Sequence, residues 1–402
     1  MMSFEAARER LLVDVPHLPA ERVVLDSALG RVLAEALVAT APIPPFSYSA
    51  MDGYVLATRD LVGTGPWSLP VRGESRTGRP APALEVGAAC VISTGAEVPA
   101  GADAVLPREV VEAAAAGIRF EGKVRPGQHI RRAGEDLAVG AVALEKGSRL
   151  GPAALGLAAS LDATEVVVAR RPRVTILCTG DELRAPGSAK VPGKIPESNS
   201  APLAALAGMA GATVRRQPHV GDDRDATEHA IREALADTDL LLTVGGVSVG
   251  DHDWVRPALE AQGVVLDFWK VSIKPGKPLA FGRHQGGTAA VLGLPGNPAS
   301  ALITFSLFGM PLLRAMQGDR APAPSFVALP LAERLTHKPG RLEFVRVALA
   351  PREGRLSVVP FENQASGALT SLAWADGLAL VPGEVETLDA GALVEVLRLQ
   401  DL

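Results

Sequence analysis

Residues 240–254 read Leu-Leu-Leu-Thr-Val-Gly-Gly-Val-Ser-Val-Gly-Asp-His-Asp-Trp, an apolar run followed by a loop with three glycines. The apolar run predicts a buried strand, and the pattern from Trp254 to Gln262 predicts a helix. Glycines between a strand and a helix leave backbone amides free to approach an anion. A carboxylate just beyond such a loop can hold Mg²⁺ against bound phosphates. The alternative is an ordinary glycine-rich turn, because a glycine loop alone is weak evidence.

Strands and helices alternate on both sides of this stretch. Apolar runs predict strands, and amphipathic or capped segments predict helices between them. The predicted strands cover residues 174–178, 213–220, 264–269 and 289–292, and the predicted helices cover 201–209, 225–236 and 298–316. Alternation of this kind implies right-handed βαβ units around a largely parallel sheet. We therefore expect a three-layer α/β/α domain over residues 170–318, with ligands at the carboxyl ends of its strands.

The rest of the chain predicts three further parts. Short alternating runs between glycines and prolines indicate a small β domain at residues 46–132. It is inserted between residues 1–45 and 133–169, which form a discontinuous N-terminal linker domain with helices expected near 4–13 and 25–33. Short strands recur from residue 319 to 402 and predict a C-terminal β-barrel-like domain.

Composition excludes several classes of protein. The chain of 402 residues has a formal net charge of −5, which argues against a general nucleic-acid or membrane-surface binder. Its two cysteines, Cys90 and Cys178, have no metal-site spacing, and no P-loop or HExxH motif occurs. The charged N-terminus has no apolar signal core, so we expect a soluble cytoplasmic protein.

Three other motifs lie at predicted strand ends. Thr179-Gly180-Asp181-Glu182-Leu183 places two carboxylates in a turn, although a capping Asp beside a solvated Glu would read the same way. The segment 270–278, Lys-Val-Ser-Ile-Lys-Pro-Gly-Lys-Pro, gathers three lysines on a stiff backbone. In an acidic protein such a cluster predicts an oxyanion site. The flanking apolar residues weaken the alternative of a solvated basic loop.

The third motif, residues 294–300, enters a helix. Asn297 is the expected N-cap and Pro298 the first helical residue, so free amides and the helix dipole would favour an anion there.

These four segments resemble the molybdopterin-binding domain shared by molybdopterin adenylyltransferases and molybdenum insertases, including the C-terminal domain of gephyrin. Five further segments resemble parts specific to the insertases, and all occur in the family's order nearly from end to end. They are Pro45–Tyr54, Ser93–Ala104, Ile130–Asp136, Arg341–Arg346 and Gln364–Gly367.

The resemblance implies a molybdenum insertase, a transferase that puts molybdate into adenylylated molybdopterin with release of AMP in the last step of molybdenum-cofactor biosynthesis. It implies Mg²⁺ and a homodimer whose site is shared between subunits, with a possible contact to the adenylyltransferase. The catalytic residues would be Asp52, Thr94, Asp136, Glu182, Asp222, Asp253, Lys270 and Lys274. Glu182, Asp222 and Asp253 would surround the metal, in which case a bound cation and lysines neutralise a breaking phosphoanhydride.

Residue pattern and resemblance together give a set of ligand-binding residues. They are Thr179, Gly180, Gly245, Gly246, Ser248, Gly250, Lys277, Pro295, Gly296, Asn297, Arg346 and Ser366. Two rival functions remain open. One is a molybdopterin adenylyltransferase, which needs only the α/β domain, so the length of the chain counts against it. The other is a non-catalytic gephyrin-like scaffold, in which the charged residues named above would have no role.

Overall fold

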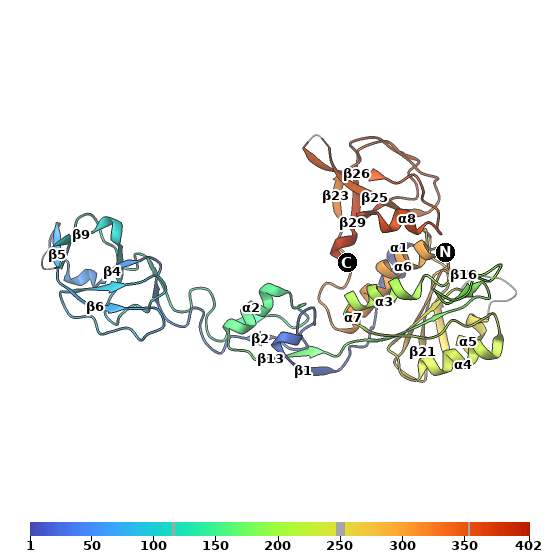
Figure 1. The fold of residues 1–402 in the computed structure, drawn as a ribbon, viewed down its shortest axis with the longest axis horizontal. Coiled ribbons are helices and arrows are strands. Elements are labelled where there is room, and N and C mark those ends of the chain that lie inside the picture. The colour runs from blue at the N-terminus through green and yellow to red at the C-terminus, as the bar shows by residue number, and fades with distance from the viewer. Residues whose placement is uncertain (115–116, 247–253, 353) are drawn as a thin grey trace.

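The computed structural model describes residues 1–114, 117–246, 254–352 and 354–402. Three of the predicted site residues, Ser248, Gly250 and Asp253, therefore lie outside the described residues. The molecule is elongated: a small β domain lies at one end, a narrow arm follows, and the α/β and C-terminal domains lie together at the other end (Figure 1).

A six-stranded sheet forms the centre of the α/β domain, with the order β17-β14-β18-β22-β21-β19. Its strands are β14 (Arg173–Cys178), β17 (Thr213–Arg216), β18 (Leu240–Val244), β19 (Val264–Phe268), β21 (Ala280–His284) and β22 (Ala290–Leu294). The first four in this order are parallel, whereas β21 and β19 pair antiparallel at one edge. The sequence did not predict β21, and a largely parallel sheet with an antiparallel edge is a common mixed arrangement.

Both faces of this sheet are covered, as expected for a three-layer domain. On β14, Val174, Ile176 and Cys178 belong to one buried cluster, and the intervening Leu177 belongs to the other. This alternation follows from the two-residue period of a strand. The first cluster includes α3 (Ser200–Met209), α6 (Pro298–Thr304), the π-helical turn Phe305–Gly309 and α7 (Met310–Met316), and the second includes α4 (Arg224–Leu235) and α5 (Val255–Ala261).

One stretch within this domain, Pro298–Met316, is long and apolar enough to cross a membrane. However, 83% of its most apolar window is buried inside the protein, as in a core helix.

The first helix of the chain, α1 (Phe4–Leu12), packs into the α/β core rather than with the N-terminal linker domain to which the sequence assigned it. The Ser3 side chain caps it by accepting a hydrogen bond from the Ala6 amide at 3.1 Å. Phe4 lies edge-on against Phe308 at 5.5 Å and Phe344 at 5.3 Å between ring centroids. Such buried aromatic contacts outweigh chain connectivity in deciding where a short helix docks.

The arm is built from two strand pairs and one helix. β1 (Ala20–Val24) pairs with β13 (Glu165–Ala169), and β2 (Leu37–Val38) pairs with β12 (Val142–Leu144). The helix is α2 (Pro152–Ser160). The predicted helix at residues 25–33 was wrong, since only Leu25–Ser27 form a 3₁₀ turn. Leu33 and Ala28 bury against β13 there, and tertiary packing overrides a weak helical pattern.

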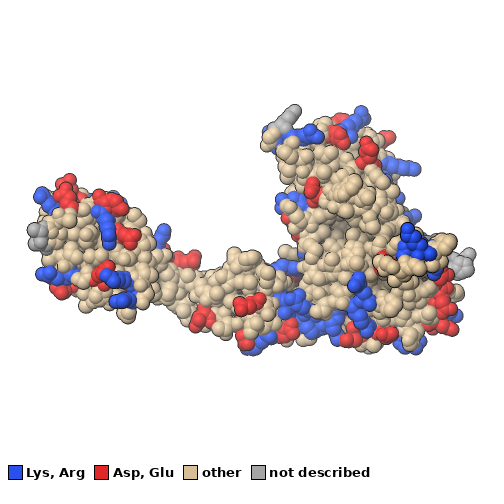
Figure 2. All heavy atoms as spheres, viewed as in Figure 1, with Lys and Arg blue, Asp and Glu red and all other residues tan. Residues whose placement is uncertain are grey.

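The root of the arm is fixed by ion pairs to the α/β domain and its following linker. Arg170 bonds the buried Asp239 carboxylate at 2.8 Å, and Arg149 bonds Asp319 at 2.6 Å. Figure 2 shows basic side chains gathered where the arm meets the α/β domain.

The small β domain contains a four-stranded sheet of order β6-β7-β4-β8 and a three-stranded sheet of order β5-β10-β9. The strands are β4 (Gly53–Leu56), β5 (Trp67–Leu69), β6 (Val71–Ser75), β7 (Ala89–Ile92), β8 (Ala104–Pro107), β9 (Glu112–Ala114) and β10 (Gly117–Phe120). Two 3₁₀ turns, Thr58–Asp60 and Arg108–Val110, connect them. β3 (Tyr48–Ser49) pairs with β11 (Ile130–Arg131) where the domain joins the arm, so its two ends lie side by side.

The C-terminal domain is a β sheet that also includes a strand from the α/β domain. Its order is β20-β25-β27-β29-β23, with β26 paired to β25, and β20 (Ile273–Lys274) comes from the basic loop. The other elements are β23 (Val327–Pro330), β24 (Leu335–Thr336), β25 (Leu342–Arg352), β26 (Arg355–Pro360), α8 (Leu369–Ala373), β27 (Gly377–Val381), β28 (Thr387–Leu388), β29 (Leu393–Arg398) and a last 3₁₀ turn, Leu399–Asp401. The shared sheet fixes the C-terminal domain beside the basic loop.

Candidate functional site

Three predicted motifs meet at the carboxyl ends of the adjacent strands β14, β18 and β22. The Thr179 amide donates to the Val244 carbonyl at 2.9 Å, and the Gly245 amide donates to the Leu294 carbonyl at 3.2 Å. These bonds continue the sheet ladder into the loops that begin with Thr179, Gly245 and Pro295. The structure therefore brings together Thr179, Gly180, Gly245, Gly246, Pro295 and Gly296.

The glycines of the second loop are required by a close approach of the backbone. Gly245 has a φ of +87°, and a Cβ there would lie 2.6 Å from the Thr179 carbonyl oxygen. Gly246 has a φ of +62°, and a Cβ there would lie 2.2 Å from a methyl group of Val255. A side chain would face both backbone strain and a clash, so only glycine keeps this loop against its neighbour.

Carboxylates gather where the first loop meets the segment after β17. The Gly180 amide donates to the Val220 carbonyl at 3.0 Å, and the Asp222 amide donates to the Asp181 carboxylate at 3.0 Å. The Glu182 side chain folds back over Gly180. A Cβ on Gly180 would lie only 2.3 Å from Oε2 of Glu182. Two predicted residues, Glu182 and Asp222, thus lie on neighbouring exposed loops. Asp181 links the two loops through its bond to the Asp222 amide, although it was not among the predicted site residues.

Oxygen donors of this kind fit a hard divalent cation such as Mg²⁺. Within the described residues, however, no group of three His, Cys, Asp or Glu side chains is close enough to hold a metal ion. Glu182 and Asp222 supply suitable donors, and the third predicted ligand, Asp253, lies outside the described residues.

A buried Asn and a half-buried Glu complete this edge, and neither was among the predicted site residues. Asn199 is only 7% exposed, and its Nδ2 donates to the Gly296 carbonyl at 2.8 Å. Glu197 accepts hydrogen bonds from the Ser200 hydroxyl at 2.5 Å and the Asn199 amide at 2.5 Å, in the position of a helix cap for α3. Burial opposes the charge of Glu197, but these hydrogen bonds hold its pKa below the ordinary value. The signal in the sequence that could have indicated this pair is the carboxylate of Glu197, just before Asn199 and Ser200.

The buried Cys178 thiol lies beside Glu197 at 3.5 Å. Burial and this carboxylate raise the pKa of Cys178 far above its ordinary value, so the thiol stays protonated. A cysteine nucleophile is therefore excluded at this edge of the sheet.

The basic loop follows β19, at the antiparallel edge of the sheet. Lys270 and Lys274 are half-buried, and Lys277 is exposed. The Lys274 ammonium lies 2.8 Å from Oε1 of Glu343 in the C-terminal domain. A Cβ on Gly276 would lie 2.3 Å from a methyl group of Thr304, so the loop packs tightly on α6. The three lysines of the motif are thus held on a rigid turn.

Asn297 is the N-cap residue of α6 and Pro298 is its first residue, both as expected. The Asn297 side chain, however, makes no capping bond. Instead its Nδ2 donates to the Ser366 hydroxyl at 3.0 Å, and the Ala299 amide donates to the Ser366 carbonyl at 3.2 Å. Ser366 therefore lies at the start of α6 and brings the C-terminal domain to the site.

Arg346 was expected to contact the ligand, but it is fully buried, with 0% exposure. Its guanidinium donates to the Gln364 side chain at 3.1 Å and to the carbonyls of Ala365 and Ala368 at 3.0 Å each. Burial lowers the pKa of Arg346. In this arrangement Arg346 shapes the loop that presents Ser366 and has no surface with which to meet a ligand.

The predicted residues of the N-terminal half lie far from this edge. The Asp52 carboxylate accepts a hydrogen bond from the Thr94 amide at 2.9 Å, so these two exposed residues are neighbours in the small β domain. Asp136 lies where the arm meets that domain, and its amide donates to the Ile43 carbonyl at 3.0 Å. The arm separates all three from the α/β domain (Figure 1). A single chain does not bring the two sets together.

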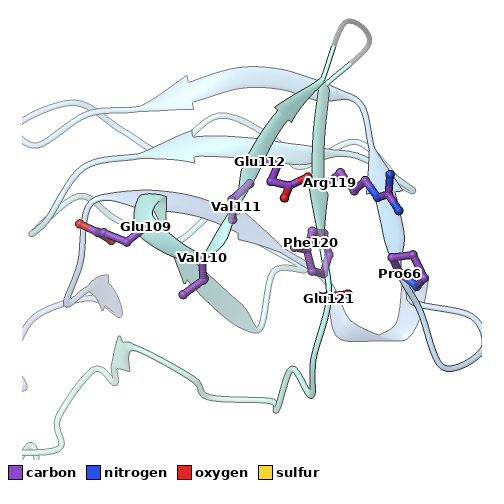
Figure 3. Close-up of a pocket in the computed structure, with 8 residues that line it drawn as sticks. All are labelled: Pro66, Glu109, Val110, Val111, Glu112, Arg119, Phe120 and Glu121. Carbon is purple, nitrogen blue, oxygen red and sulfur yellow. The ribbon is translucent and has the colours of Figure 1, made fainter.

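The small β domain has a pocket of its own, of about 440 Å³. Figure 3 shows the residues that line it, three glutamates and one arginine among them: Pro66, Glu109, Val110, Val111, Glu112, Arg119, Phe120 and Glu121. An excess of carboxylates disfavours an anionic ligand, so this pocket is no rival to the strand-end site.

Comparison with known proteins gives matches over nearly the whole chain. Residues 2–161 match the MoeA N-terminal region (domains I and II), residues 175–315 match a probable molybdopterin-binding domain, and residues 328–399 match the MoeA C-terminal region (domain IV). A molybdopterin molybdenumtransferase 2 of Mycobacterium tuberculosis is 38% identical over 94% of each chain. A molybdopterin molybdenumtransferase of Synechococcus elongatus is 38% identical over 99% of this chain and 100% of the relative.

A crystal structure of a molybdopterin biosynthesis MoeA protein from Pyrococcus horikoshii has the same fold. It is 29% identical, with a TM-score of 0.84 over 98% of this chain and 99% of that one.

Proposed function

The chain belongs to the molybdopterin molybdenumtransferase family, enzymes of molybdenum-cofactor biosynthesis, and from this premise we propose that it inserts molybdate into adenylylated molybdopterin and releases AMP. The observation that carries the proposal is the meeting of the glycine loop, the acidic loops and Ser366 at the carboxyl ends of β14, β18 and β22. Such a site offers amides to a phosphorylated anion and carboxylates to a cation, and in this proposal the basic loop supplies ammonium groups.

Each part of the site has a distinct task in this proposal. The amides of the loop beginning at Gly245 bind and orient phosphate oxygens, and Lys270 and Lys274 stabilise negative charge as the phosphoanhydride breaks. Glu182, Asp222 and Asp253 would hold Mg²⁺, which would supply Lewis-acid charge to the phosphate oxygens. No covalent nucleophile is needed, in keeping with the protonated state of Cys178.

We also propose that the site is completed by a second copy of the chain. Asp52, Thr94 and Asp136 lie across the arm from the strand-end site, as described above. In a two-fold dimer the arm of each subunit can reach the α/β domain of its neighbour. The same proposal places the protein in the cytoplasm, where its two cysteines remain reduced.

One experiment separates this activity from its rivals. The purified protein is mixed with adenylylated molybdopterin, molybdate and Mg²⁺, and AMP is measured with and without molybdate. Molybdate-dependent AMP release is the expected result. Consumption of ATP in the presence of free molybdopterin would indicate an adenylyltransferase instead, and no turnover of either kind would leave the scaffold function.

A further inference from the structure

A buried carboxylate from the C-terminal domain lies behind the basic loop. Glu343 is 5% exposed, and its Oε1 atom lies 2.8 Å from the Lys274 ammonium. The two residues face each other across the parallel pair β20–β25, in which Ile273 lies opposite Leu342 and Lys274 opposite Glu343. The ion pair therefore joins the α/β domain to the C-terminal domain in a fixed register.

A histidine holds this carboxylate from the other side. Nε2 of His337 lies 3.1 Å from Oε2 of Glu343, and Nδ1 lies 2.8 Å from the Val385 carbonyl oxygen. The His337 side chain is only 2% exposed. Its Nε2 atom makes no well-aligned hydrogen bond among the described residues, so its contact with Glu343 is one of close packing. The carboxylate thus lies between the Lys274 ammonium and the His337 ring.

The backbone that carries Lys274 is held just as firmly. Ile273 is fully buried, and its carbonyl accepts a hydrogen bond from Arg341 at 3.1 Å. On the other side of Lys274, Gly276 packs against Thr304 of α6, as described above. The backbone on both sides of Lys274 is therefore held, at the junction of the α/β and C-terminal domains.

Lys274 itself remains accessible. Its side chain is 41% exposed, against 7% for that of Glu343. An ammonium group has three N–H donors, so one ion pair leaves donors that can meet a ligand anion. Burying a carboxylate costs desolvation free energy, which the ion pair with Lys274 does not necessarily exceed. The pair is therefore better explained by the placement of Lys274 than by the stability of the fold.

Building on the function proposed above, we propose that Glu343 is a positioning residue, which aims the Lys274 ammonium at the substrate anion. The C-terminal domain then takes part in the reaction through this carboxylate as well as through Ser366. Glu343 acts through Lys274 and touches no substrate itself.

The test is a double-mutant cycle on AMP release. Glu343→Gln keeps the shape of the side chain but loses its charge, and it is expected to lower kcat by roughly 10- to 100-fold, the effect of misplacing a catalytic group. Lys274→Ala is expected to lower activity as well. In the Lys274→Ala background, adding Glu343→Gln is expected to change kcat by less than about two-fold, because contacting residues are not additive.

A structural role would give a different cycle. If Glu343→Gln causes its full loss of activity with or without Lys274, Glu343 acts through the fold, and the proposal is overturned. The same follows if Glu343→Gln leaves kcat unchanged. Glu395→Gln is the matched control, since Glu395 is exposed on β29 of the same sheet, and it should retain wild-type activity. Should Glu343→Gln fail to fold by circular dichroism, the same cycle is run with Glu343→Asp, which keeps the charge and withdraws it by one methylene.

A binding measurement separates this inference from the proposed function. Calorimetric titration with AMP alone needs no turnover. Lys274→Ala and Glu343→Gln should each weaken AMP binding, and the double variant should bind about as weakly as Lys274→Ala. If the wild type releases no AMP but this binding pattern holds, the function fails and the positioning role stands. Unchanged AMP binding in Glu343→Gln, together with unchanged turnover, overturns the positioning role alone.

Discussion

Gly245 is a residue at which the candidate site tolerates little change, since a Cβ would lie 2.6 Å from a backbone atom, the Thr179 carbonyl oxygen. Gly245→Ala should lower the free energy of unfolding by about 1–3 kcal/mol and activity by more than tenfold, because strain at positive φ adds to a displaced loop. Gly187→Ala is the control: its φ is +81°, but a Cβ there would meet nothing within 4 Å. Urea unfolding and AMP release measure both effects. Equal losses in the two variants would show that φ alone matters.

Asp239 gives a pH-dependent prediction at the same scale. Burial opposes its charge, but hydrogen bonds from Arg170 and Arg173 lower its pKa. Its stabilising effect is therefore complete above the unfolded pKa of about 4 and is lost as the pH falls through the lower folded pKa. Asp239→Asn should lower the free energy of unfolding by about 1–3 kcal/mol at pH 7. Asp237 is an exposed neighbour that is also paired with Arg173, and Asp237→Asn should change the free energy of unfolding little.

Urea midpoints of the wild type and both Asn variants check this, at pH 7 and at the lowest pH at which the wild type stays folded. The difference in urea midpoint between the wild type and Asp239→Asn should become smaller on acidification. A difference that is constant with pH would show that the carboxylate contributes shape rather than charge.

Individual residues also show what a sequence can and cannot predict. The glycine loops and the lysine motif were found from residue types, because a strand end followed by Gly or Lys is a local pattern. Glu343 and Asn199 were missed, since their importance comes from contacts with Lys274 and Gly296 that lie far away along the chain. Arg346 was assigned to the ligand by the family resemblance, and its burial in this structure argues against that role.

At the scale of elements, α1 is the part whose position the sequence did not reveal. Its apolar stripe predicted a helix, but a stripe does not say which core receives it. Phe4→Ala should lower the free energy of unfolding by about 3–5 kcal/mol, the usual cost of removing a buried aromatic ring. Phe46→Ala, at a site 43% exposed, should cost far less. Urea unfolding of both variants decides the matter, and equal stability of Phe4→Ala and wild type would mean that α1 is dispensable to the core.

The predicted sheet and its covering helices emerged almost complete from periodicity, because βαβ units have local signals. The antiparallel strand β21 did not, because Gly282 and the polar residues 283–284 interrupt the apolar pattern that marks a strand. The 3₁₀ turn at Leu25–Ser27 replaced a predicted helix for a related reason. In a thin arm few neighbours exist, and packing on β13 decides the local structure.

At the scale of the whole molecule, the separation of Asp52 from the strand-end site makes the assembly testable. Asp52→Ala and Lys274→Ala should each have strongly reduced activity, but a mixed dimer holds one site with neither change if the arm completes the partner's site. Unfolding and refolding the two variants together should therefore restore activity to about one quarter of wild type, since half of randomly paired dimers are mixed and each has one of two sites intact. Mass spectrometry confirms the mixing, and refolding each variant alone is the control. Mixed dimers without activity would place both residues in the same subunit's site.

The docking of Phe4 against Phe308 and Phe344 also has a consequence for the order of events on the ribosome. At about 5–20 residues per second, roughly 300 residues must be added after α1 emerges, which takes about 15–60 s, before its partners exist. The small β domain lies within one continuous stretch and closes through β3 and β11, so it can mature during that interval. While the nascent chain has not yet reached Met310, its small β domain can already be folded, but the apolar face of α1 is still exposed to water. We expect the chain to depend most on chaperones during this interval.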